Sequence, residues 1–344
     1  PLNDLTVVGG DLTLDGTLNV LTSPGGSFDP GVYRVISYGG ALTDNGLAIG
    51  TIPSPDFFVQ TSIPQQVNLV NTAGLTLDWW DGDAGPKDDG VANGGTGTWQ
   101  SSAGNDNWTD ASGTVNAPFA DGAFAIFPGA FGTVTVDDSA GQVTVSGMQF
   151  LTDGYRVQGD AIGLAGTSAT IRVGDGTADG ARTTATVASN LTGDAQLVKT
   201  DLGRLVLVGT NSYAGGTRID GGVLEISRDA NLGAASGAIA LDGGTLRTTA
   251  DISLARTTTL GAGGGTFDTT DATLAQASAI GGTGALTKAG SGTMIVAAAN
   301  SWSGGTTVAQ GTLQVGDGGT TGSITGDVVD NGVLAFDRAD DLGF

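Results

Sequence analysis

The strongest constraint on the fold of this chain is a segment that occurs twice. Residues 197–226 read LVKTDLGRLVLVGTNSYAGGTRIDGGVLEI, and residues 286–315, 89 positions further on, read LTKAGSGTMIVAAANSWSGGTTVAQGTLQV. The copies align without a gap. The matching polar, aromatic, glycine and leucine positions are Lys199, Asn211, Tyr213, Gly215, Gly216 and Leu224 in the first copy and Lys288, Asn300, Trp302, Gly304, Gly305 and Leu313 in the second. A fixed period of this kind indicates a repeat architecture.

A shorter period lies inside the long one. Triplets of the form Gly-x-apolar end at Leu224, Leu246, Phe267, Leu313 and Leu334. Their spacing is 22, 21, 46 and 21 residues, and residues 284–286 supply the turn missing from the gap of 46. We therefore expect about four coils of roughly 22 residues in each 89-residue unit. Coils of this length, with short strands and Gly, Asp or Asn corners, are typical of a parallel β-helix.

The composition agrees with an all-β fold. The hydrophobic fraction of 39% is enough for a core, and the 61 glycines follow no three-residue period, which excludes collagen. We predict β-helix coils over 1–78, a Trp/Gly/Asp-rich lobe or insertion over 79–130, and further coils over 131–344 with repeats at about 193–233 and 282–324. A sandwich or barrel is the alternative with many short strands, but it does not explain the 22-residue step.

The charge and the missing residue types exclude several functions. A formal charge of −22 with only 13 basic residues repels phosphate backbones, so nucleic acid is not expected as a partner. The chain has no histidine and no cysteine. Ser-His-Asp hydrolysis, zinc sites that use histidine, and disulfides are therefore impossible within it. We predict no catalytic residues, no metal site and no cofactor.

Two acidic patterns need a separate interpretation. Adjacent aspartates such as Asp137 and Asp138 point to opposite faces of a strand, so adjacency does not make a catalytic dyad. Five aspartates between Asp78 and Asp89 could hold calcium, but their spacing fits no EF-hand loop and no glutamate is near. Solvated corner residues are the favoured interpretation of both.

Tryptophan gives the only ligand-binding candidates. Four of the five tryptophans, Trp79, Trp80, Trp99 and Trp108, fall in the 79–130 segment. Exposed on one face, they could form a platform for a sugar or a protein. Packing inside the segment is the competing interpretation, because large aromatic side chains are mostly used for burial.

The duplicated segment resembles the passenger-associated transport repeat of autotransporter passengers from Gram-negative bacteria, of the form L-x-K-x-G-x-G-x-L-x-L-x-G-x-N-x-[YW]-x-G-G-T. Four positions depart from this pattern: Asp201 stands for the first glycine of the first copy, Met294 and Val296 stand for leucines in the second, and Ala298 stands for a glycine. The apolar changes keep the core pattern, and Ala298 puts the glycine of that corner in doubt.

The resemblance implies a right-handed parallel β-helix, exported by type V secretion and displayed at the cell surface outside the outer membrane. Its expected partners are a C-terminal outer-membrane β-barrel of the same polypeptide, absent from this sequence, and host-cell surface or matrix molecules. The function expected from it is a structural stalk of an adhesin that aids its own export and folding. The alternatives are a glycan- or protein-binding module that uses the tryptophans, and a polysaccharide-active enzyme on a β-helix.

Overall fold

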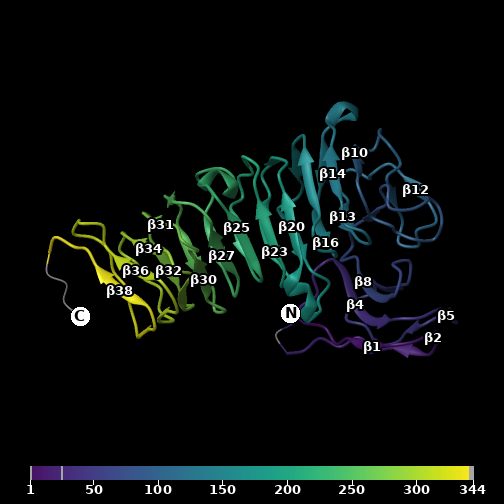
Figure 1. Cartoon of the computed structure of the whole chain (residues 1–344), viewed down its shortest axis with the longest axis horizontal. Coiled ribbons are helices and arrows are strands. Elements are labelled where there is room, and N and C mark those ends of the chain that lie inside the picture. Colours follow the sequence, from purple (N-terminus) through teal and green to yellow (C-terminus); the bar gives the residue numbers. More distant parts are fainter. Residues whose placement is uncertain (1, 25, 341–344) are drawn as a thin grey trace. The chain divides into compact units, whose positions relative to one another are not determined.

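The computed structural model describes residues 2–24 and 26–340, and apart from three short 3₁₀ turns the regular elements among them are short β-strands (Figure 1). The chain divides into two compact units. The first comprises residues up to 165 with 171–185 and 201–203, and the second comprises 166–170, 186–200 and the rest of the chain from 204. Among the described residues, no helix has the length and apolar character needed to span a membrane.

The second unit is a stack of coils in which each strand pairs in parallel with the strand one coil away (Figure 1). Its three ladders are called faces A, B and C. Face A contains β22 (Gln196–Thr200), β24 (Thr217–Ile219), β26 (Ile239–Leu241), β29 (Thr258–Leu260) and β32 (Ile280–Gly282). Face B contains β23 (Arg204–Leu207), β25 (Val223–Ile226), β27 (Thr245–Thr248), β30 (Gly265–Asp268), β33 (Leu286–Ala289), β35 (Thr306–Val308) and β37 (Val328–Asp330). Face C contains β28 (Ile252–Leu254), β31 (Thr273–Gln276), β34 (Thr293–Val296), β36 (Thr312–Val315) and β38 (Val333–Phe336).

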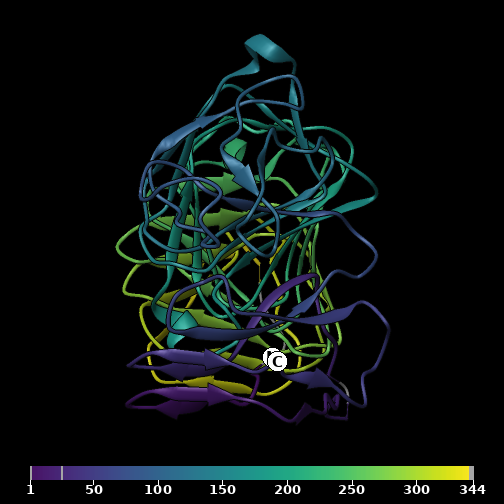
Figure 2. The same ribbon diagram turned by 90° about the vertical axis from the view of Figure 1, so that its right-hand side faces the viewer.

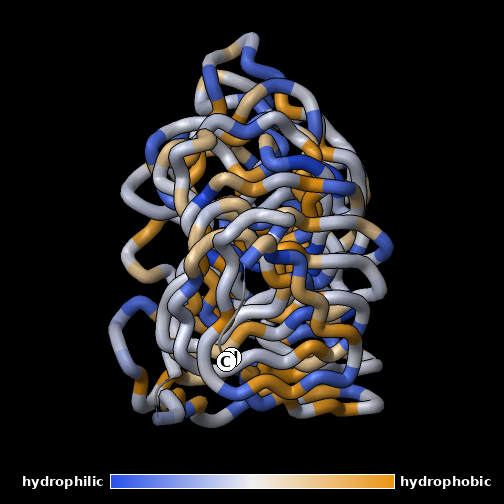
Figure 3. The backbone as a smooth tube through the Cα atoms, turned by 90° about the vertical axis from the view of Figure 1, so that its left-hand side faces the viewer, coloured by the Kyte–Doolittle hydropathy of each residue, from blue (hydrophilic) through white to orange (hydrophobic). Residues whose placement is uncertain are grey.

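Alternating burial explains why these sequences form coils. In most of these strands the residues alternate between buried apolar and more exposed polar side chains, as the two-residue period of a strand requires. The same alternation is visible along the tube in Figure 3. On face B, Leu224 pairs with Leu246, and Leu246 pairs with Phe267; all three are fully buried. The predicted parallel β-helix is therefore confirmed, and these three residues form an apolar ladder in its core.

The register corrects one part of the sequence interpretation. Phe267 is followed on face B by Lys288, whereas Leu313 lies on face C between Met294 and Leu334. The first repeat copy alternates between faces A and B, in β22 to β25, and the second alternates between faces B and C, in β33 to β36. Along face A, β32 lies four coils after β22. The next strand in the chain, β33, lies on face B. The long period is thus four coils and one face, which the sequence spacing alone did not reveal.

The first unit also contains stacked parallel strands. One ladder consists of β9 (Leu77–Trp80), β13 (Phe124–Phe127) and β16 (Gly147–Phe150). The others are β10 (Gly97–Trp99), β14 (Thr133–Val136) and β17 (Arg156–Gly159), and the pair β15 (Val143–Val145) and β18 (Ile162–Leu164). The strands β19 (Ser168–Val173) and β20 (Thr184–Val187) contribute residues to both units, and β21 (Leu191–Thr192) lies in the second. Three 3₁₀ turns, η1 (Asp138–Ala140), η2 (Ala178–Arg182) and η3 (Asp229–Leu232), complete the elements away from the N-terminal segment.

The N-terminal segment begins as coils and then changes direction. Three parallel pairs, in the purple to dark-blue part of the ribbon at the bottom of Figure 2, join β1 (Thr6–Val8) to β4 (Gly31–Tyr38), β2 (Leu12–Leu14) to β5 (Leu42–Asp44), and β3 (Thr17–Leu18) to β6 (Ala48–Ile49). After them, β8 (Gln66–Asn71) pairs antiparallel with both β4 and β7 (Phe57–Gln60). This antiparallel sheet was not anticipated, because its strands have the same alternating pattern as coil strands.

The Trp-rich segment is a widened coil. Trp79 and Trp80 lie on β9 and Trp99 on β10, and both strands pair in parallel with strands of the next coil. After β10 and before the next coil strand, β13, the chain forms a loop in which β11 (Trp108–Thr109) pairs antiparallel with β9 and with β12 (Asn116–Ala117). The extra residues therefore enlarge one coil of the ladder instead of forming a separate lobe.

The face B ladder makes a stability prediction. Replacing Leu246 by Ala removes buried side-chain atoms from between Leu224 and Phe267, so we expect the free energy of unfolding to fall by about 2–5 kcal/mol in urea denaturation followed by circular dichroism. Val208→Ala, at a side chain that is 39% exposed, is the control and should change it by no more than about 0.5 kcal/mol. Equal effects of the two substitutions would contradict the assigned core.

Candidate functional site

The four candidate tryptophans lie inside the protein, and Trp80, Trp99 and Trp108 form one aromatic cluster. Their exposed fractions are 0–2%. The ring centroids of Trp99 and Trp108 are 4.9 Å apart, those of Trp80 and Trp108 are 5.1 Å apart, and Phe119 and Phe127 pack against the same rings. No ring face is open to solvent, so this arrangement does not fit the exposed platform considered from the sequence.

Adjacent Trp79 and Trp80 are both buried because β9 is covered on both sides. Trp80 points into the aromatic cluster, and its indole nitrogen donates a 2.8 Å hydrogen bond to the carbonyl of Gly95. Trp79 lies in a second cluster with Val32 and Val70 of the N-terminal sheet. Two large aromatic residues in a row are thus a consequence of the packing of this sheet on the coil.

The aspartates of the neighbouring loop hold its backbone. Asp81 is fully buried and accepts hydrogen bonds from the Asn93 backbone and the Asn116 side chain, both 2.9 Å long. The other four carboxylates, those of Asp78, Asp83, Asp88 and Asp89, also accept from backbone N–H groups. Within the described part of the chain, no three acidic side chains are arranged to hold a metal ion.

The repeat lysines occupy equivalent buried positions. The Lys199 ammonium group donates to the carbonyls of Thr200 and Gly221, at 2.7 and 3.2 Å. Lys288 donates to the matching carbonyls of Ala289 and Gln310, at 2.7 and 3.1 Å, and also to Gly290. Both lysines are fully buried. Each lysine thereby pairs carbonyl groups at a coil corner, where the turning backbone has lost its ladder partners.

The repeat asparagines and aromatic residues close the next corner in the same way in both copies. The Asn211 side-chain oxygen accepts from the backbone of Leu191, and Asn300 accepts from that of Ile280, both at 2.8 Å. Two residues further on, the Tyr213 hydroxyl contacts Thr217 Oγ1 at 2.7 Å, and the Trp302 indole nitrogen donates to Thr306 Oγ1 at 3.0 Å. These side chains replace strand pairing where the chain is irregular.

The paired glycines are fixed by close packing between coils. A Cβ atom at Gly215 would collide with the backbone of Ala195 and Gln196, and one at Gly304 with that of Gly284 and Ala285. The residues that follow, Gly216 and Gly305, have φ angles of +81° and +83°. Only glycine adopts this conformation without strain, so the Gly-Gly pair is a requirement of the corner.

One repeat position departs from glycine and has a different role. Asp201 has a φ angle of +65°, close to the +76° of Gly290 at the same position in the second copy. A non-glycine residue in this left-handed region is strained. Its carboxylate lies 3.1 Å from the guanidinium of Arg172, and both side chains are 2% exposed. The backbone strain is therefore accompanied by a buried ion pair that a glycine could not form.

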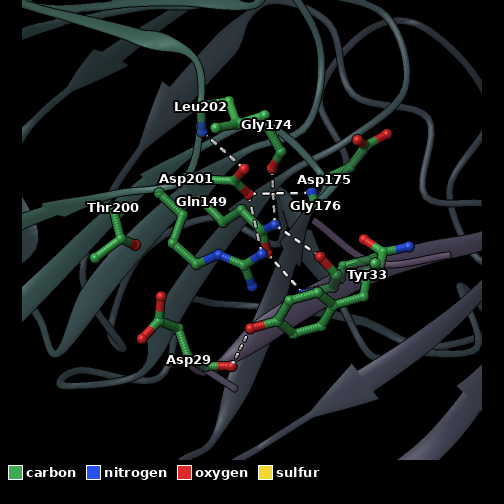
Figure 4. A network of polar contacts seen from close by, with 12 residues as sticks. Asp29, Tyr33, Gln149, Gly174, Asp175, Gly176, Thr200, Asp201 and Leu202 are labelled. Atoms are coloured by element: carbon green, nitrogen blue, oxygen red, sulfur yellow. Dashed lines mark hydrogen bonds and ion pairs between the residues drawn. The ribbon is translucent and has the colours of Figure 1, made fainter. Parts of the chain in front are cut away.

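The Asp201 carboxylate belongs to a polar network that holds β4 against the coil backbone (Figure 4). The Arg172 guanidinium is 4.1 Å from the centre of the Tyr33 ring, as in a cation–π contact, and donates to the Pro30 carbonyl at 3.0 Å. Asp201 also accepts from the Gly176 backbone. Burial raises the pKa of Tyr33 to about 12, against the opposing effect of Arg172, so the ring stays neutral.

Gln149 completes this network by acting as a strand partner for β4. Its side-chain amide accepts from the Val32 N–H at 2.7 Å and donates to the Val32 and Gly174 carbonyls, each at 2.9 Å. The preceding Gly31 has a φ angle of +116°, and a Cβ atom there would collide with the Gln149 side chain. Glycine at this position lets the strand approach the coil.

A second ion pair lies near the first and connects β4 to the segment that follows β19. Arg34, on β4, is 2.8 Å from Asp175, and the Asp175 carbonyl accepts from the Arg34 backbone at 3.1 Å. We call Tyr33, Arg34, Gln149, Arg172, Asp175 and Asp201 the docking network. Sequence reasoning did not find it, although Asp201 at a glycine position was the available signal.

Comparison with known proteins agrees with this geometry. The passenger-associated-transport-repeat family matches residues 197–226 and 286–315. Over 343 residues the chain is 54% identical to the adhesin BmaC autotransporter of Brucella suis biovar 1 (strain 1330). The alignment covers 100% of this chain and 10% of that protein, so the chain spans about a tenth of the length of its relative. No solved structure matches the chain.

The docking network predicts a double-mutant result. Asp201→Gly should lower the unfolding free energy by about 3–5 kcal/mol, because Arg172 stays buried without its partner. Adding Arg172→Met should recover much of this loss. Tryptophan fluorescence in urea reports the first unit, which contains four of the five tryptophans.

The control for this cycle is Arg182→Met. Arg182 pairs with Asp179 at the surface, where the side chains are 87% and 69% exposed, so its loss should change the free energy by less than about 1 kcal/mol. If the double mutant loses as much stability as the sum of the single mutants, the two side chains are not coupled and the network is misassigned.

Lys288 predicts a pH dependence. Desolvation lowers its pKa from 10.5 to about 8, against a smaller opposing effect of Asp268. Between pH 8 and 10.5 the unfolded chain therefore holds a proton that the folded chain has released, so Lys288 makes stability rise with pH in this window. The difference in unfolding free energy between the native chain and Lys288→Met should increase from pH 8 to 10. A difference that stays constant or falls over this range would contradict the desolvation of Lys288.

Proposed function

From its transport repeats and its homology over the whole chain, this protein belongs to the autotransporter passengers, and we propose that it is a stalk segment that aids its own export and folding. The passenger is displayed at the cell surface after export through the outer membrane. The observation that carries the proposal is the repeat itself: its glycine, asparagine, aromatic and lysine side chains all close coil corners.

The corner arrangement supports folding one coil at a time. Within faces A, B and C, paired strands are 19–22 residues apart, so a new coil needs only the coil beside it. The repeat side chains pair the backbone groups that the ladder leaves open at the corners. A coil that forms outside the cell with no unpaired corner groups would oppose backward movement of the chain through the membrane.

The wider role of the protein is proposed by analogy. The relative is described as an adhesin, and this chain corresponds to a tenth of it. We propose that the segment supports adhesion by holding other parts of the polypeptide away from the cell. Host-cell surface or matrix molecules, and the outer-membrane β-barrel that autotransporters carry in the same polypeptide, are the partners expected for the whole protein.

The geometry favours a stalk over the two alternatives. A glycan platform would need exposed tryptophans, and all four are buried. A polysaccharide-active enzyme would need a cleft with converging carboxylates. The two clefts described in the structure contain one carboxylate and none, respectively.

Two deletions of one coil each test the proposal in the full-length protein. Deleting 286–305 removes most of the second repeat copy and joins Ala285 to Thr306, which pairs with Leu286 in the ladder, so the register is kept. Deleting 265–285 removes an ordinary coil and joins Gly264 to Leu286, which pairs with Gly265. We expect the first deletion to lower the amount of passenger at the cell surface, measured by flow cytometry, because the corner side chains are lost. The second should leave it nearly unchanged.

The purified chains with the same deletions provide the control. Both should keep their β-structure by circular dichroism, since the ladder is continuous in each. Equal surface amounts for the two deletions, with both purified chains folded, would remove the case for a role of the repeat in export.

A further inference from the structure

The first unit contains an apolar cleft of about 370 Å³ that the stalk function does not use. Its floor is formed by β4 and β8, and its walls are formed by residues 2–4 with Thr6 of β1 on one side and by residues 18–23 and 26–28 on the other. The volume is within the range of small-molecule sites in proteins, about 300–1,000 Å³.

The floor is a cluster of apolar side chains. Tyr33 and Val35 of β4 belong to one hydrophobic cluster with Leu69, which is the cross-strand partner of Tyr33. Phe28 packs edge-on against Tyr33, with ring centroids 5.2 Å apart. Leu18 also lines the cleft. The floor is therefore aliphatic and aromatic, whereas Asn3, Asn19 and Thr22 contribute polar groups to the walls.

The docking network makes this floor rigid. The Tyr33 ring is in contact with the buried Arg172 guanidinium, and its hydroxyl donates to the Asp29 carbonyl at 3.0 Å. A ring held by these two contacts cannot turn to fill the cleft. The cleft is thus preformed, and a ligand would bind without first ordering its floor.

The rim combines exposed apolar residues with a negative charge. Leu2 and Leu21 line the cleft and are 64% and 79% exposed, so they add apolar surface to its rim. Asp4 is the charged residue among those that line the cleft, and no basic residue lines it. The nearby Arg34 and Arg172 are already paired with Asp175 and Asp201.

We propose that this cleft binds a small amphiphilic cation, with its apolar body against Tyr33, Val35 and Leu69 and its positive group beside Asp4. The apolar lining would bury the body of the ligand. The carboxylate, together with the net charge of −22, selects a cation over an anion. The proposal concerns a site separate from the repeats and does not depend on their role in export.

Three probes with the same tail test the proposal on the purified chain: octylammonium, 1-octanol and octanoate, each titrated below its aggregation concentration by isothermal calorimetry and ligand-observed NMR. We expect saturable one-to-one binding in the order octylammonium, octanol, octanoate, with about a tenfold difference in dissociation constant between the two ions. Asp4→Asn should weaken octylammonium binding about threefold to fivefold and leave octanol unchanged.

A blocking variant tests the location. Ser27 is exposed and lines the cleft, so Ser27→Trp fills it from the rim without changing the core, and binding of octylammonium and octanol should fall at least about tenfold. Asp194→Asn and Thr320→Trp, at exposed positions of the second unit, are the matched controls and should bind like the native chain.

Either of two results would overturn the proposal. One is octanoate binding as tightly as octylammonium. The other is a Ser27→Trp variant that keeps the native circular dichroism spectrum and thermal midpoint and still binds both probes. If Ser27→Trp does not fold, Thr22→Trp, at another exposed position on the same wall, provides the same test.

Discussion

The structure of the second unit depends on parallel pairing between successive coils, and the difficulty of that arrangement lies at the corners. Along a strand the ladder satisfies the backbone, but where the chain turns, N–H and C=O groups lose their partners inside the protein. The repeat answers with side chains: Lys199 and Lys288 donate to corner carbonyls, and Asn211 and Asn300 accept from the coil beside them. The glycine pairs give the turning backbone the space it needs. The conserved pattern of the two copies thus consists of residues that pair backbone groups at the corners and glycines that leave space for the turning backbone.

Because the coil has three similar faces, the same solution can be used on more than one of them. The first repeat copy uses faces A and B, and the second uses faces B and C, with the same internal bonds. A repeat whose contacts are all local to two neighbouring coils does not need a fixed place around the axis. This freedom explains a period of four coils and one face, and it fits a segment whose role is to stack and to be exported.

The first unit shows how one such position can be modified. At the corner where Gly290 stands in the second copy, the first has Asp201 in the same left-handed conformation. The carboxylate joins Arg172, and through it Tyr33, so that an accessory sheet is held on the coil. The same contacts fix the floor of the apolar cleft. Asp201, at a glycine position of the repeat, is thus connected through Arg172 and Tyr33 to the cleft for which a ligand is proposed.

The sequence by itself determined the coil architecture, the strand alternation and the corner residues. These depend on contacts between neighbouring coils, and the length of a coil is visible as a repeat of about 22 residues in the sequence. It also pointed to Asp201 as a departure. Only the tertiary structure decided which ladder each strand joins, since a short strand with alternating burial fits any of three faces. It also decided that the four tryptophans are buried: Trp79 lies against Val32 of β4, which is distant in sequence, and the other three pack against one another and against Phe119 and Phe127. The docking network could not be predicted from the sequence. Gln149 and Arg172 contact β4 although they are more than a hundred residues away in the chain, and local sequence patterns carry no information on such contacts.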